Sequence, residues 1–255
     1  MWDRTTVECV QSQDLPWQPV PAGELGASGG VRRTLSADAS AGAATTLVRF
    51  RSRQRGVLVA GADLYVLAGE GLVNGEPYGP NHYLFVPPAA HLDLMPIGGP
   101  TTVLAGTFGP ADLVDGAAGR SPVTHVDVEG IAWSAPDWAG PGPGSAVKWL
   151  RRDEFGVAFL SAKLPGWRSS QEERHPQAEE SFRISGDLFV GAPGVTTAGS
   201  YFFHRPGLWH GPLYTRGGTS AFVRADAEIS TEYRNPVTAV DRGRAYLTHS
   251  HPALI

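Results

Sequence analysis

The chain has 255 residues, of which 42% are hydrophobic and 18% charged, and its net charge is −4. This composition excludes a disordered chain, and a weakly acidic balance argues against nucleic-acid binding. Cys9 is the single cysteine, so an internal disulfide is impossible. Neither a signal peptide nor a run of membrane-spanning length is visible, so we expect a cytoplasmic protein without a membrane or nucleic-acid partner.

Short apolar runs, separated by many of the 32 glycines and 21 prolines, follow one another along the chain. Each run is rich in β-branched or aromatic residues, which is typical of strands bounded by turns. The predicted strands, in chain order, are Thr45–Phe50, Leu64–Leu67, Tyr83–Val86, Thr102–Gly106, Val157–Ser161, Ser181–Ile184, Tyr201–His204 and Ser220–Arg224. Many short strands at near-even spacing predict an all-β sandwich or barrel.

The segment Trp133–Ser145 carries three glycines and three prolines, which predicts a linker between two halves. We therefore expect five parts, in chain order: an N-terminal arm (1–40), a first domain (41–132), the linker (133–145), a second domain (146–235) and a C-terminal tail (236–255). His249 and His251 fall in that tail. We expect the tail to pack over the other half or a neighbouring subunit and not to form a second metal site.

The two halves resemble each other in sequence. ADLYVLAGE at 62–70 corresponds to EESFRISGD at 179–187, with glycines 117 positions apart. A Tyr-led strand then leads to His91 in the first half and to His210 in the second, 119 positions apart, and a Thr-rich strand follows each histidine. Three correspondences in the same order predict a duplicated domain.

The second half carries residues with metal-ligand spacing. Glu173 and His175 are two positions apart, so they share one face of a strand, and Glu179 follows four positions later. His210 comes two strands further on. A closed barrel would bring side chains from such separate strands together.

This pattern resembles the cupin family, whose motifs are G-x5-H-x-H-x3/4-E-x6-G and G-x5-P-x-G-x2-H-x3-N. Here the first reads Gly166-x6-Glu173-x-His175-x3-Glu179-x6-Gly186, and the second reads Gly199-x6-Pro206-Gly207-x2-His210. The amino-acid sequence of these two motifs is most similar to that of ChrR-type cupins and related two-cupin proteins. The resemblance covers roughly residues 40–110 and 150–230. It implies two tandem double-stranded β-helix, or jelly-roll, barrels, and a metal held by His175, Glu179 and His210.

Glu173 stands where the first motif histidine is expected, and we consider it either a fourth ligand or a catalytic base. Two histidines with carboxylates and open positions suit Fe(II) first, with Mn, Ni or Zn as alternatives. In the first half the corresponding positions are Gly56, Leu58 and Ala62, and only His91 remains. We therefore interpret the first cupin as degenerate and without metal.

Residues of a substrate pocket follow from strand alternation. If Glu179 points inward, so do Ser181 and Arg183. Gln177 shares the face of His175 as a further pocket residue. Tyr201 and Phe203 are assigned to the pocket, with the opposite face, Phe202 and His204, as the alternative.

These features predict a metal-dependent bicupin enzyme acting on a small organic molecule, with Fe(II)-type dioxygenase or oxidoreductase chemistry as first choice. The alternatives are a non-oxidative isomerase or lyase, and a non-catalytic small-molecule-binding or sensory protein. Exposed sheet edges would also allow a homodimer.

Overall fold

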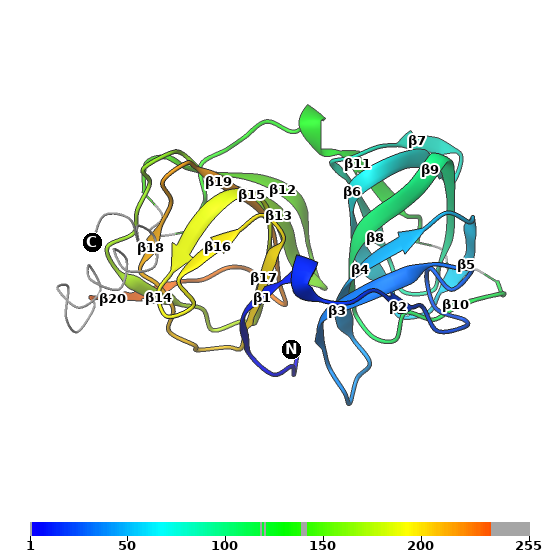
Figure 1. Ribbon diagram of the computed structural model, residues 1–255, viewed down its shortest axis with the longest axis horizontal. Helices are drawn as coiled ribbons and strands as arrows, with labels where there is room; N and C mark the ends of the chain where they lie inside the picture. Colours follow the sequence, from blue (N-terminus) through cyan, green and yellow to red (C-terminus); the bar gives the residue numbers. More distant parts are fainter. Residues whose placement is uncertain (1, 118, 120, 139–141, 236–255) are drawn as a thin grey trace. The chain divides into compact units, whose positions relative to one another are not determined.

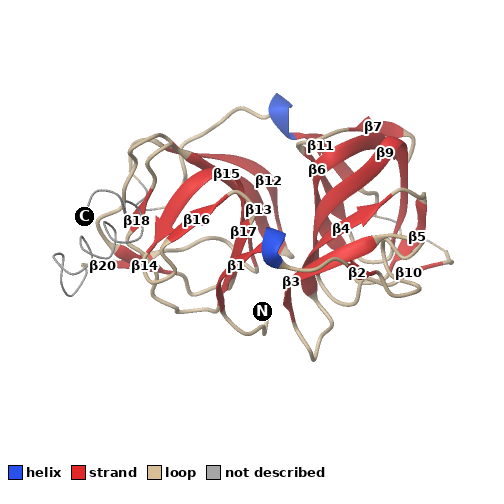
Figure 2. Cartoon of the chain, viewed as in Figure 1, coloured by secondary structure: helices blue, strands red, loops and turns tan. Residues whose placement is uncertain are grey.

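The structure is a computed structural model that describes residues 2–117, 119, 121–138 and 142–235. The expected C-terminal tail, with His249 and His251, lies outside the described residues. The chain divides into two compact all-β units (Figures 1 and 2). One comprises residues 13–131, and the other the described residues of 1–12 and 132–255. No helix within the described ranges has the length and apolarity to cross a membrane.

The first unit is a barrel of ten strands around one apolar core. Its sheet runs in the order β11-β8-β6-β9-β4-β3-β2, with β5, β7 and β10 paired outside this path. The strands are β2 (Gln18–Pro19), β3 (Val31–Ala37), β4 (Ala44–Phe50), β5 (Gln54–Leu58), β6 (Ala62–Val73), β7 (Glu76–Tyr78), β8 (His82–Val86), β9 (Ala90–Thr107), β10 (Leu113–Val114) and β11 (Thr124–Asp127). Short 3-10 turns, η1 (Ser12–Asp14) and η2 (Val128–Gly130), lie at its two ends in the sequence.

The second unit repeats this arrangement, with its sheet in the order β1-β17-β15-β19-β13-β12 and a two-stranded ribbon of β14 and β20. The strands are β1 (Val7–Gln11), β12 (Ser145–Asp153), β13 (Gly156–Lys163), β14 (Glu172–Arg174), β15 (Glu179–Val190), β16 (Val195–Thr197), β17 (Ser200–His204), β18 (Leu213–Tyr214), β19 (Thr219–Ala225) and β20 (Glu232–Arg234). All eight predicted strands are confirmed, as is the all-β class with two tandem barrels.

The two barrels agree in strand register. In the first, Ala62 pairs with Val86 on one side and Thr107 on the other. In the second, Glu179, 117 positions after Ala62, pairs with His204 and Ala225, each 118 positions after its counterpart. Both central strands, β6 and β15, have a shift of register four positions after these residues, at Val66/Ala68 and Arg183/Ser185. The barrels are therefore comparable position by position.

The N-terminal residues do not form the separate arm that we expected over 1–40. Strand β1 pairs with β17 at the edge of the second barrel, whereas β2 and β3 belong to the first. An unpaired edge on β17 would leave backbone groups without partners, and β1 supplies them. The linker also differs in part, because Ser134 exchanges two backbone hydrogen bonds with Val147 of β12, at 2.9 and 2.8 Å.

Residues before β1 cover the outer face of the second barrel. The Arg4 guanidinium donates to Glu180 at 3.2 Å, and Arg224 donates to the other carboxylate oxygen at 2.7 Å. The Tyr201 hydroxyl donates to Glu180 at 2.5 Å, and Trp2 lies under the Arg224 guanidinium, 4.7 Å from its ring centroid. All three charged side chains are almost fully buried. Burial of charges is tolerated only when they are paired in this way.

This network predicts that Arg4→Met destabilises the second barrel. Removing one partner of a buried ion pair costs about 3–5 kcal/mol, and we expect the lower end because Arg224 and Tyr201 remain on Glu180. Urea unfolding followed by fluorescence measures the change. Arg205→Met, at an exposed residue whose side chain contacts Thr6, is the matched control. Equal stability of the two variants would contradict a structural role for Arg4.

Candidate metal centre

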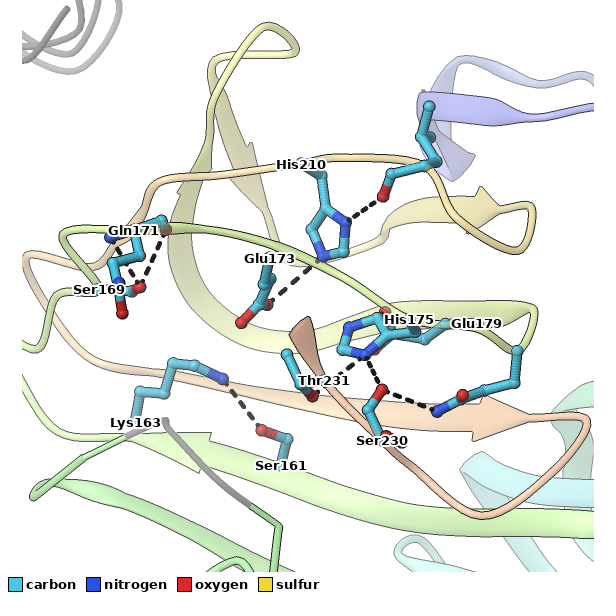
Figure 3. A network of polar contacts seen from close by, with 12 residues as sticks. Ser161, Lys163, Ser169, Gln171, Glu173, His175, Glu179, His210, Ser230 and Thr231 are labelled. Atoms are coloured by element: carbon cyan, nitrogen blue, oxygen red, sulfur yellow. Dashed lines mark hydrogen bonds and ion pairs between the residues drawn. The ribbon is translucent and has the colours of Figure 1, made fainter. Parts of the chain in front are cut away.

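Separate segments of the second barrel bring four sequence-predicted residues together (Figure 3). Glu173 lies on β14, His175 directly after it, Glu179 at the start of β15, and His210 in the loop after β17. Glu173 and His210 exchange two backbone hydrogen bonds, both of 2.9 Å. The Gly207 N–H donates to the carbonyl of His175 at 2.7 Å, which ties the Pro-Gly turn of the second motif to the first.

The side-chain atoms of these residues converge. One group, Glu173, His175 and His210, places its ligand atoms within 4.8 Å of one another, and a second joins Glu179 and His210 with His204. Two ligand atoms, each about 2.1 Å from one ion, lie roughly 3.0–3.4 Å apart. The contacts Glu173 Oε1–His210 Nε2 and Glu179 Oε2–His175 Nε2 both measure 3.4 Å. That spacing is longer than a charge-assisted hydrogen bond and fits ligands that share an ion.

The hydrogen bonds of the two imidazoles fix which nitrogen faces the cluster. His175 Nδ1 lies 3.1 Å from the carbonyl of Ser230, and His210 Nδ1 lies 3.3 Å from that of Leu208. A carbonyl only accepts, so each Nδ1 carries the proton. In the neutral ring Nε2 then presents a lone pair toward a carboxylate oxygen. Such an arrangement needs a proton or a cation between the two, so the residues fit a metal ion.

His204 joins this cluster although the motif does not assign it. Its ring stacks on Phe202 with centroids 4.3 Å apart, and it lies 4.4 Å from the ring of His210. Its buried Nδ1 has no hydrogen-bond partner among the described residues. The only sequence signal was alternation on β17, which places Phe202 and His204 on one face. From the sequence, this face is predicted only as the alternative to that of Tyr201 and Phe203.

The cluster shifts the pKa values of its members in opposite directions. Burial acts to raise the pKa of Glu173, but His210, His175 and Lys163 outweigh it, so this pKa lies below its ordinary value. Burial acts to lower the pKa of His210, yet Glu173 and Glu179 hold it above the ordinary range. For His204, burial together with His210 and His175 brings the pKa well below 6.5, which leaves a neutral ring.

A cavity of about 70 Å³ opens onto the cluster, enough for a few water molecules or a small ligand. Ser181 and Arg183 line it, as does Phe202. Apolar side chains complete the wall, among them Trp138, Phe159, Leu188, Val190, Leu213, Val223 and Ile229.

Three expected pocket residues lie elsewhere. Tyr201 and Phe203 face the outer side of β17, where Tyr201 contacts Glu180 and Phe203 lies 6.4 Å from the ring of Trp2. Strand alternation makes the two faces exclusive, and the N-terminal residues that bury the outer face gave no sequence signal. Gln177 donates to the carbonyl of Ser230 at 3.4 Å, so it helps to position the partner of His175 and is not part of the cavity lining.

Lys163 is a cavity residue that sequence reasoning missed. It ends β13, and its Nζ donates to Ser161 Oγ at 3.1 Å and lies 4.9 Å from the centroid of Trp167. In Figure 3, Glu173 and His210 lie above Lys163 and Ser161. Burial and Arg183 lower the pKa of Lys163 to about 8, against the opposing influence of Glu173 and Glu179. The sequence places Lys163 two positions after Ser161, on the same face of a strand. It does not show that this face lies close to Glu173 and His210.

The first barrel has no comparable cluster in the part that the structure describes. Leu58 and Ala62, which stand in place of His175 and Glu179, are fully buried in an apolar core. His91 is half-buried on β9, where its backbone carbonyl accepts from Asn74 at 3.4 Å.

Comparisons with known structures identify the fold. A protein from Nostoc punctiforme described as a candidate dioxygenase has a TM-score of 0.73 at 19% identity, covering 86% of this chain and 82% of its own. A variant of Bacillus subtilis oxalate decarboxylase has a TM-score of 0.61 at 11% identity, covering 89% of this chain and 79% of its own. YlbA from E. coli has a TM-score of 0.58 at 13% identity, covering 85% of this chain and 89% of its own. Both barrels have the cupin fold.

Comparison of the sequence itself adds one family. The model for a domain of unknown function, DUF4437, matches residues 116–232, which include all the strands from β12 to β19. No curated protein matches the chain. The matched region thus contains the whole cluster and, of the strands of the first barrel, β11 alone.

The depressed pKa of His204 predicts how the stability of the metal-free protein depends on pH. A neutral buried histidine stabilises the fold fully above 6.5, and this contribution is lost as pH falls toward the folded-state pKa. Between about pH 5 and 6.5 we expect stability to fall by at most roughly 1.4 kcal/mol per pH unit from this residue. In that window the curve should be flatter in His204→Phe, as measured by denaturant unfolding. Identical slopes would show that His204 does not carry the effect.

Proposed function

We propose that the second barrel holds one divalent metal ion and that the protein is a metal-dependent bicupin enzyme acting on a small organic molecule. The observation that carries this is the pair of imidazoles whose Nδ1 atoms lie against backbone carbonyls, while each Nε2 faces a carboxylate at 3.4 Å. His175, Glu179 and His210 would hold the ion, with Glu173 as a fourth ligand or as a base.

Fe(II) is the first choice of metal, with Mn, Ni or Zn as alternatives. A set of two histidines and a carboxylate with open positions suits non-haem iron. A bound ion would supply Lewis acidity and, if it is Fe(II), electrons for dioxygen. The similarity to a protein described as a candidate dioxygenase supports dioxygenase or oxidoreductase chemistry as the first reaction class.

The protein's own groups have separable tasks in this proposal. Glu173 is available to accept a proton at Oε1, because its depressed pKa keeps it ionised. The neutral ring of His204 fills the space beside His210 without adding charge. The apolar wall built by Phe159, Val223 and Ile229 limits water around a bound substrate.

A non-oxidative lyase or isomerase is the second candidate. Glu173 favours it, since an ionised carboxylate beside a Lewis-acidic ion is suited to proton transfer without dioxygen. One of the structural neighbours is named as a decarboxylase. Turnover of a substrate under strict exclusion of oxygen would separate this reaction class from a dioxygenase.

For the first barrel we propose a degenerate cupin that binds no metal. Its interior at the corresponding positions is apolar, as Leu58 and Ala62 show. The barrel would then contribute stability or shape and not chemistry.

Metal content of the purified protein tests the proposal. We expect about one equivalent of Fe, Mn, Ni or Zn per chain after anaerobic reconstitution with Fe(II) and desalting, measured by elemental mass spectrometry without a His tag. Loss of a residue that only hydrogen-bonds to a metal ligand already costs about 10–100-fold in metal affinity. Removal of a ligand itself should cost more, so His175→Ala, Glu179→Ala and His210→Ala should each retain less than about a tenth of the metal.

His91→Ala is the matched control, because it removes the corresponding histidine from the first barrel and should leave the metal content unchanged. Circular dichroism verifies that each variant is folded. Loss of metal from the His91 variant, or full retention in the His210 variant, would overturn the assignment to the second barrel.

A further inference from the structure

Two cationic side chains lie in the same cavity as the acidic and histidine cluster. Lys163 of β13 and Arg183 of β15 both line it, on strands that each pair with β19. Lys163 pairs with Thr219 in the backbone register, and the Arg183 guanidinium donates to the hydroxyl of that same threonine at 3.1 Å. The two cations are therefore adjacent.

Neither cation has a carboxylate partner. Within the described ranges, no ion pair forms on Arg183 or Lys163, and each is bound by one neutral hydroxyl. Arg183 is 4% exposed, and its Nε has no hydrogen-bond partner among those residues. Asp187 and Glu179 act on Arg183 only at longer range, without an ion pair, and the Asp187 carboxylate accepts from the backbone of Arg216 and Gly217. A buried guanidinium without a directly paired counter-ion is costly, so its retention points to a ligand.

The first barrel shows that the fold does not require these charges. By the shared register, Lys163 corresponds to Phe50, which pairs with Thr101 as Lys163 pairs with Thr219. Arg183 corresponds to Val66, which pairs with Val103 as Arg183 pairs with Ala221. Phe50 and Val66 are fully buried in the apolar core. The same barrel can thus be built with two hydrophobic residues at these positions.

A bound metal would engage the two cluster carboxylates whose charges act on Lys163, and Arg183 would keep only the longer-range charge of Asp187. The carboxylates of Glu173 and Glu179 together balance one divalent ion, so they cannot also neutralise Lys163 and Arg183. An anionic group beside these cations would restore the balance and would lie next to the cluster. The small volume and apolar walls favour a short ligand with one polar end.

We propose that Lys163 and Arg183 form the subsite for the carboxylate of a small organic acid, which is the substrate class of the second barrel. The guanidinium presents paired N–H donors to the two oxygens of a carboxylate, and the ammonium adds a point charge. Ser161 and Ser181 line the same space and offer hydroxyls. The assignment of this ligand as a substrate rests on the proposed function, but anion binding itself does not require the metal.

The test is titration of the metal-free protein with propionate, its neutral amide propionamide, and inorganic phosphate. Isothermal calorimetry and intrinsic tryptophan fluorescence, to which Trp167 beside Lys163 contributes, give two readouts. We expect saturable binding of propionate, weakened about tenfold or more in Lys163→Phe and Arg183→Val and for the amide. These substitutions install the residues that the first barrel accommodates, and thermal unfolding verifies the fold.

Two further variants separate charge from packing. Arg183→Lys keeps the positive charge and should retain most of the affinity that Arg183→Val loses. Arg216→Met removes an exposed arginine near β18 and should bind propionate like the unaltered protein. Absence of propionate binding, equal binding by the charge-removed variants, or binding of phosphate alone would each overturn the carboxylate subsite.

Failure of this inference is distinguishable from failure of the proposed function. Metal uptake without propionate binding, in both the metal-free and the Zn(II)-loaded protein, would remove the subsite and leave the metal centre. Propionate binding that depends on Lys163 and Arg183, in a protein that takes up no metal, would retain the subsite and remove the metal-dependent enzyme.

Discussion

Glu179 and Glu180, at the start of β15, point to opposite faces of the sheet, and both carboxylates are largely buried. Strand alternation forces this division, so the barrel must satisfy one negative charge on its outer face and another in its interior. On the outside, Arg4 and Arg224 pair with Glu180. On the inside, Glu179 faces His175 and the rest of the cluster. The N-terminal residues that cover the outer face and the candidate metal centre in the interior thus each compensate one of the two buried carboxylates.

The sequence predicted the fold and much of the cluster because both depend on local signals. Short β-branched runs between turns located the strands, and the spacing of Glu173, His175 and Glu179 predicted a common face. His204 entered only as an alternative and Lys163 was missed, because their positions depend on which strands pair with β15 and β13. That information comes from contacts between residues far apart in the chain.

The errors have the same physical origin. Tyr201 and Phe203 were assigned to the pocket because aromatic residues suit both a pocket wall and a buried outer face. Residues before β1 cover that outer face, and they are mostly polar apart from Trp2 and lack periodicity. Likewise, β1 is a short edge strand whose hydrogen-bonding partner is about 190 positions away, so no local pattern marks it.

The pairing of β1 with β17 has a consequence for the order of folding. Residues 7–11 are synthesised before the whole first barrel, whereas their partner strand emerges only after it. Nothing in the first barrel's own sheet requires β1, so that barrel can fold while synthesis continues. The second barrel instead has to recapture a segment made at the outset, across a long loop whose closure slows folding. We therefore expect the second barrel, which contains the candidate metal centre, to complete its folding after the first.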